Sequence, residues 1–248
     1  MKERLIRLVL GKRGSGKSFY VKQESLKANR VLIYDTIGEY SGYGVTVSDL
    51  DELIEYWLKI HDKNFRIVYQ PLRPAQEFDD VCDLVYACGD MVFIAEEIDI
   101  FTTNYDLSES FANIIQRGRH RNIDFFGVSQ RPYRINRTVS SQAKEIITFI
   151  QTEPRDLEYL RLYMGSDHID KISNLPEYHY FKWTSGGVIE IGKKKGGGEN
   201  GLSNTHNEKP DEGSFRGDGE AESGEGLGRR GTSGSENTSP LPDEELDQ

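Results

Sequence analysis

Long apolar runs are absent from this sequence of 248 residues. No run approaches the roughly 20 apolar residues that a helix needs to cross a bilayer, so we expect no membrane span. The first apolar stretch is interrupted by Arg4 and Arg7, which is not the pattern of a signal peptide. Cysteine is scarce, with only Cys82 and Cys88, and the five histidines are scattered. These absences argue against a disulfide scaffold and a His/Cys metal centre, and they favour a reduced, cytoplasmic protein.

Apolar and aromatic residues are also depleted in the last part of the chain. After residue 192, Phe215 is the only Phe, Tyr or Trp, and Gly, Ser, Glu and Asn dominate. Such a segment buries too little apolar surface to offset an ordering entropy of about 1–2 kcal/mol per residue. We therefore predict a folded domain over residues 1–192 and a disordered acidic tail over 193–248. The tail has 7 basic and 13 acidic residues, so the domain has a net charge of only −4 out of −10.

Within the domain, segments of strand character alternate with segments of helical spacing. This alternation predicts an α/β fold with a mainly parallel sheet, helices on both faces and a closing β-hairpin over 178–192. The expected strands are 4–10, 30–35, 65–70, 91–95, 123–130 and 145–151. The expected helices run to about Asn29 after the first strand and over 47–60, 74–89, 108–118 and 154–165, with a Ser48 or Asp49 cap on the second.

The strongest motif is LVLGKRGSGKS, which matches G-x-x-x-x-G-K-[ST] directly after a strand and before a helix. Glycines let such a loop curl so that backbone N–H groups surround phosphates. Lys17 is predicted to reach the β/γ-phosphates of ATP, and Ser18 to hold Mg²⁺. The predicted nucleotide-binding residues are Gly11, Lys12, Arg13, Gly14, Ser15, Gly16, Lys17, Ser18 and Phe19.

Two carboxylates follow the apolar strand in MVFIAEE. They fit the Walker B pattern of four apolar residues, an acid and then Glu, with Glu in place of the usual Asp. We assign Glu96 to the metal and Glu97 to the role of general base that polarises an attacking water. The alternative is a pair of solvated charges at a strand end.

Four segments together resemble the FtsK–HerA superfamily of P-loop ATPases: GKRGSGKS, VLIYDTIGEY, VFIAEE and RGRHRNIDFFGVSQRP. The resemblance covers roughly residues 4 to 151. It implies that the strand after Walker B lies between the Walker B strand and the P-loop strand and ends in a polar sensor, Gln130. It also implies a ring in which Arg117, Arg119 or Arg121 contacts the neighbouring subunit's ATP. Asp35 falls where the family often has Asp-Pro, with Thr36 in place of the proline.

The resemblance, together with the small size of the domain, favours a viral genome-packaging ATPase: a homo-oligomeric ring acting on double-stranded DNA with capsid or other assembly proteins. Its location would be the host cytoplasm or the virion. The alternatives are a nucleotide-dependent switch, a filamentous-phage assembly ATPase of the zonular-occludens-toxin type, and a small-molecule kinase. The three arginines also have two alternative roles: they could cap a helix end, or they could contact DNA directly. The loop 101–110 is a candidate pore loop.

Overall fold

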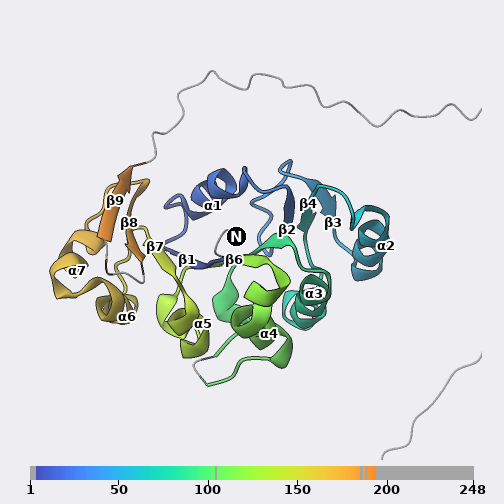
Figure 1. Cartoon of the computed structure of the whole chain (residues 1–248). Coiled ribbons are helices and arrows are strands. Elements are labelled where there is room, and N and C mark those ends of the chain that lie inside the picture. Colours follow the sequence, from blue (N-terminus) through green and yellow to red (C-terminus); the bar gives the residue numbers. More distant parts are fainter. Residues whose placement is uncertain (1–3, 104, 185–186, 188, 194–248) are drawn as a thin grey trace, which may run out of the picture. The chain divides into compact units, whose positions relative to one another are not determined.

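A nine-stranded sheet forms the centre of the molecule, in the order β3-β4-β2-β5-β6-β1-β7-β8-β9 (Figure 1). The computed structural model describes residues 4–103, 105–184, 187 and 189–193. Strands β1 to β7 run parallel, and β8 and β9 add an antiparallel hairpin at one edge. The α/β fold, the mainly parallel sheet and the closing hairpin are confirmed. The tail predicted from residue 193 lies outside the described residues, apart from Lys193 at the end of β9.

The strands are β1 (Ile6–Leu10), β2 (Arg30–Tyr34), β3 (Val45–Val47), β4 (Phe65–Tyr69), β5 (Met91–Ala95), β6 (Ile123–Ser129), β7 (Glu145–Thr148), β8 (His179–Thr184) and β9 (Ile189–Lys193). The α-helices are α1 (Lys17–Ser25), α2 (Leu50–Ile60), α3 (Pro74–Cys88), α4 (Glu109–Arg117), α5 (Arg137–Gln142), α6 (Pro154–Met164) and α7 (Ser166–Ser173). Short 3-10 helices are η1 (Ile98–Ile100), η2 (Gly118–Arg121) and η3 (Pro132–Arg134).

Helices cover both faces of the sheet, with α1 on one face and α3, α4 and α5 on the other (Figure 1). Two apolar clusters match these layers. Tyr20 and Val21 of α1 pack with Val9 and Ile33, whereas Phe78 of α3 belongs to the larger cluster on the opposite face. This double cover explains why the central strands are mostly apolar, and wholly so in β5, instead of alternating between apolar and polar residues. Of the helices described, none is long and apolar enough to cross a membrane.

Local sequence explains most helix boundaries. Asp49 caps α2, because its side chain accepts hydrogen bonds from the N–H groups of Asp51 and Glu52. Ser108 caps α4 in the same way. The helix after the P-loop ends at Ser25, earlier than the predicted Asn29.

The strand order places the two sequence motifs side by side. β6 pairs with β5 on one side and with β1 on the other. The strand after Walker B therefore lies between the Walker B and P-loop strands, as the resemblance implied. Because these strands are parallel, their carboxyl ends meet at one edge of the sheet, and this edge holds the candidate site.

Candidate active site

The P-loop connects β1 to α1 through backbone conformations that favour glycine. Gly16 has φ 106° at the start of α1. A Cβ added at Gly11 would lie 2.7 Å from both the Phe149 Cβ and the Ser15 Oγ, so a larger residue would disturb the loop. The segment thus forms the tight turn into a helix N-terminus that the motif predicts.

Two polar groups in the loop are suited to a phosphate. The Lys17 ammonium is buried and donates a hydrogen bond to the Lys12 carbonyl at 2.9 Å. The Ser15 hydroxyl is buried and has no hydrogen-bond partner among the described residues. Burial lowers the pKa of Lys17, and the nearby Glu96 and Glu39 carboxylates act in the opposite direction. A bound phosphate would supply acceptors to both groups.

Glu96 lies at the end of β5 and is only 1% exposed. Its Oε1 accepts hydrogen bonds from the Tyr40 hydroxyl at 2.5 Å and from the Ser18 hydroxyl at 3.3 Å. Ser18 also donates a short hydrogen bond to Glu39. Burial raises the pKa of Glu96 to about 7, against the effect of the Tyr40 hydrogen bond.

The oxygens of Ser18, Glu39 and Glu96 form a donor set that fits Mg²⁺. Mg²⁺ prefers oxygen ligands and is usually held by one or two carboxylates together with substrate phosphates and water. The described residues contain no cluster of three or more His, Cys, Asp or Glu residues that could hold a metal ion by themselves.

Glu96 makes the stability of the metal-free protein depend on pH. Its pKa is raised from 4.5 to about 7 in the folded state, so the folded protein binds a proton that the unfolded chain has lost between these values. The free energy of unfolding therefore falls as pH rises through this window. Glu96→Gln is expected to stabilise the protein at pH ~8 by on the order of 1–3 kcal/mol, and to have little effect at pH ~4.

Thermal melting in the presence of a chelator measures this difference, and a shift of several degrees is expected at the higher pH. An equal rise in melting temperature at both pH values would show that ionisation of Glu96 does not lower the stability of the folded protein.

Glu97 is positioned by two side chains from neighbouring strand ends. Its Oε1 accepts a hydrogen bond from Gln130 Nε2 at 3.2 Å, and its Oε2 accepts one from Thr36 Oγ1 at 3.2 Å. Glu97 also has φ 52°, a left-handed conformation that costs about 1–3 kcal/mol outside glycine. The structure therefore brings the predicted base and the predicted sensor into contact and holds the base in a strained backbone.

The loop after β2 contributes residues that the sequence motifs did not reveal as part of the site. Asp35 is buried and accepts hydrogen bonds from the backbone N–H groups of Glu39 and Tyr40. This folds the loop back so that Glu39 and Tyr40 reach Ser18 and Glu96. The available signal was the acidic and aromatic pair that follows Gly38 in YDTIGEY.

Other residues predicted in the P-loop differ in exposure. Arg13 lines the same small pocket as Lys17 and Gln130. Lys12 is exposed, and Phe19 is 44% exposed on α1.

The arginines at the end of α4 and in η2 lie at the opposite edge of the sheet. Arg117, Arg119 and Arg121 precede β6, whereas Gln130 follows it, and a seven-residue strand spans roughly 20 Å. Arg121 donates hydrogen bonds to the carbonyls of Tyr86 and Ala87 in the last turn of α3. Arg121 therefore has a helix-capping role, and contact of these arginines with ATP in a neighbouring subunit stays a prediction.

The sheet order, the P-loop and the adjacent acidic strand end define the fold of a P-loop NTPase. The genome packaging NTPase B204 of Sulfolobus turreted icosahedral virus 2, solved with ATP-gammaS, has this fold. It superposes with a TM-score of 0.64 and 22% identity, over 78% of this chain and 98% of that one.

Two further solved structures are similar. B204 of Sulfolobus turreted icosahedral virus, a DNA-packaging ATPase, gives a TM-score of 0.61 and 21% identity, over 79% of this chain and all 100% of that one. VirB4 of Thermoanaerobacter pseudethanolicus gives a TM-score of 0.55 and 14% identity, over 77% of this chain and 89% of that one. No protein-family model and no curated protein matches the sequence, so the likeness is one of fold. This fold agrees with the resemblance drawn from the sequence motifs.

Proposed function

We propose that this protein is an ATPase that forms a ring and moves double-stranded DNA, as a genome-packaging motor does. The observation that carries the proposal is the meeting of Lys17, Ser18, Glu96, Glu97 and Gln130 at one edge of the sheet. Support also comes from the fold shared with packaging NTPases. The place of action would be the host cytoplasm or the virion.

Each group in the site has a role in this proposal. Lys17 would bind the β/γ-phosphates, and Gln130 would orient the attacking water beside them. Glu97 would accept the proton of that water, and its hydrogen bonds to Gln130 and Thr36 would fix its direction. Ser18 and Glu96, with Glu39, would hold Mg²⁺, which when bound offsets phosphate charge.

Phosphate release with and without double-stranded DNA tests the proposal. We expect DNA to stimulate ATP hydrolysis and the protein to form rings with bound nucleotide, visible by negative-stain microscopy. Hydrolysis that DNA leaves unchanged would contradict the motor. Nucleotide binding without turnover would instead indicate a switch, an outcome that the Glu97–Gln130 contact argues against.

The exposed loop between η1 and α4 is a proposed DNA contact of such a ring. Tyr105 is 98% exposed there, and the loop follows the strand end that holds Glu96 and Glu97. A pore-facing position would link DNA to the acidic strand end.

A further inference from the structure

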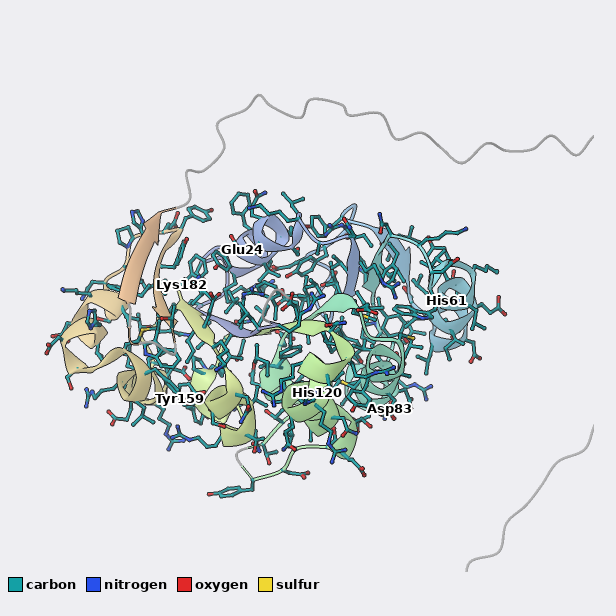
Figure 2. All side chains as sticks on the ribbon, viewed as in Figure 1. Glu24, His61, Asp83, His120, Tyr159 and Lys182 are labelled. Atoms are coloured by element: carbon teal, nitrogen blue, oxygen red, sulfur yellow. The ribbon has the colours of Figure 1, made fainter. Side chains whose placement is uncertain are left out.

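Three exposed arginines gather on one surface that no sequence motif identified. Arg134 ends η3, Arg137 begins α5, and Arg155 lies in the first turn of α6. Two tyrosines lie among them: Tyr133 of η3 and the largely buried Tyr159 of α6, whose label in Figure 2 lies between α6 and α5. We call these five residues the arginine–tyrosine surface.

The charges of these arginines are not neutralised by carboxylates. None of the three forms an ion pair within the described part of the chain, whereas the adjacent Arg131 is bound to Asp156 at 3.1 Å and to Glu153 at 3.8 Å. Glu158 borders the surface, but its carboxylate pairs with Arg161 at 2.9 Å. The three arginines therefore give the surface a net positive charge on a chain whose net charge is −10.

Aromatic rings hold the guanidinium groups in place. Arg134 and Arg155 each lie 5.8 Å from the centre of the Tyr133 ring, and Arg137 lies 5.2 Å from that of Tyr159. Cation–π contacts of this kind orient a guanidinium while leaving most of its N–H donors free. The hydrogen bond from Arg134 also lowers the pKa of Tyr133, which agrees with a positive local potential.

The shape of the surface suits an extended anion. A hollow of about 380 Å³ is lined by Tyr133, Arg137, Arg155, Glu158, Tyr159 and Leu162. Because Arg131, Arg134 and Arg155 lie 5.1–5.8 Å from the centre of the Tyr133 ring, they compete with an unpaired base for stacking on that ring. A planar guanidinium group matches phosphate oxygens because it can direct two of its N–H donors at one phosphate.

We propose that the arginine–tyrosine surface binds the phosphate backbone of double-stranded DNA. The inference rests on the proposed function, and it names a second surface of each subunit that contacts the DNA, in addition to the loop between η1 and α4. Three free arginines correspond to about three phosphate contacts, which position the duplex without reading its sequence.

The surface is also connected to the active site. η3 follows Gln130 after one residue, and Arg131 in between is fixed to Asp156 of α6. The carbonyl of Gln130 accepts a hydrogen bond from Gln151, while its side chain contacts Glu97. A displacement of η3 or α6 therefore moves the segment that positions Gln130, the predicted sensor.

The dependence of DNA affinity on salt tests this proposal. The triple variant Arg134→Gln, Arg137→Gln, Arg155→Gln is compared with a control that also removes three exposed charges, Lys59→Gln, Lys63→Gln, Lys171→Gln. Fluorescence anisotropy with a labelled duplex gives the slope of log affinity against log salt. We expect the arginine variant to lose about 2–3 units of slope and at least ~10-fold in affinity at low salt.

The control variant should bind with nearly the wild-type slope, because its lysines lie on α2, shortly after α2, and on α7. An equal loss in both triple variants would mean that only overall charge matters, and it would overturn the assignment. Melting temperatures check the fold, and the single variant Arg155→Gln, with an expected loss of about 1 unit, serves if the triple variant does not fold.

The failures of the two proposals are distinguishable. If the wild-type protein binds no DNA, the motor proposal fails and the surface assignment fails with it. If the wild type binds DNA and the arginine variant binds with the same slope, only the surface assignment is overturned. Unchanged DNA affinity with loss of DNA-free hydrolysis would instead assign these arginines to a neighbouring subunit's nucleotide, and would also overturn it.

Discussion

Lys17→Ala is expected to abolish ATP hydrolysis and to weaken nucleotide binding strongly. Lys17 is the buried cation of the P-loop, and its ammonium already occupies the loop by donating to the Lys12 carbonyl. Alanine removes the positive charge that would face the β/γ-phosphates. The pocket would then face the phosphates with the carboxylates of Glu39, Glu96 and Glu97 and with Arg13 as its remaining cation. Repulsion by Glu39, Glu97 and the ionised fraction of Glu96 in a partly desolvated site should lower affinity as well as rate.

Binding of a fluorescent ATP analogue and release of phosphate measure the two effects separately. The matched control is Lys27→Ala, which removes an exposed lysine just beyond the end of α1. We expect wild-type binding and turnover in the control. Turnover at the wild-type rate in Lys17→Ala would exclude the P-loop as the site of hydrolysis, provided that the variant melts near the wild-type temperature.

The strands of the sheet core could be predicted because apolar residues dominate each of them and polar or turn residues bound them. β2, β4, β5 and β6 begin and end within one residue of their predicted bounds. Such strands are buried on both faces, so hydrophobicity alone identifies them. The place of β6 between β5 and β1 came from the family resemblance, because strand order is a long-range property.

Short elements at the periphery escaped prediction for physical reasons. β3 has three residues, two of them exposed, so no apolar pattern marks it. α5 contains β-branched and hydroxyl residues that are poor helix formers, and it is stabilised by the Asn136 cap and the buried Val139. α7 has only eight residues, and Gly165, with φ 80°, separates it from α6.

The residues of the active site likewise fall into those that the sequence predicts and those that only the fold brings together. Lys17, Ser18, Glu96, Glu97 and Gln130 occur in linear motifs at strand ends, and the parallel sheet brings them together. Glu39 and Tyr40 reach the site because Asp35 folds their loop through hydrogen bonds to their N–H groups, and Thr36 of the same loop donates a hydrogen bond to Glu97. Arginines that are clustered in the sequence, such as those before β6, are easy to find. The positive surface is not, because η3, α5 and α6 bring its arginines together from separate segments.

Glu97→Gln is expected to bind ATP with Mg²⁺ and to hydrolyse it at least ~10²-fold more slowly, the usual scale for loss of an acid–base group. The amide has nearly the shape of the carboxylate, and its oxygen can still accept a hydrogen bond from Gln130. The amide cannot take a proton from water at neutral pH. The defect should therefore lie in the rate of the chemical step, with nucleotide affinity kept.

Single-turnover hydrolysis isolates that step, and equilibrium binding in the same buffer shows whether the site stays intact. Glu55→Gln, an exposed carboxylate on α2, is the matched control and should turn over like the wild type. The partner variant Glu96→Gln distinguishes the two acids, because loss of a metal ligand should weaken the dependence of binding on Mg²⁺. If Glu96→Gln binds ATP tightly without hydrolysing it while Glu97→Gln remains active, the base is Glu96, and the assignment is wrong by one residue.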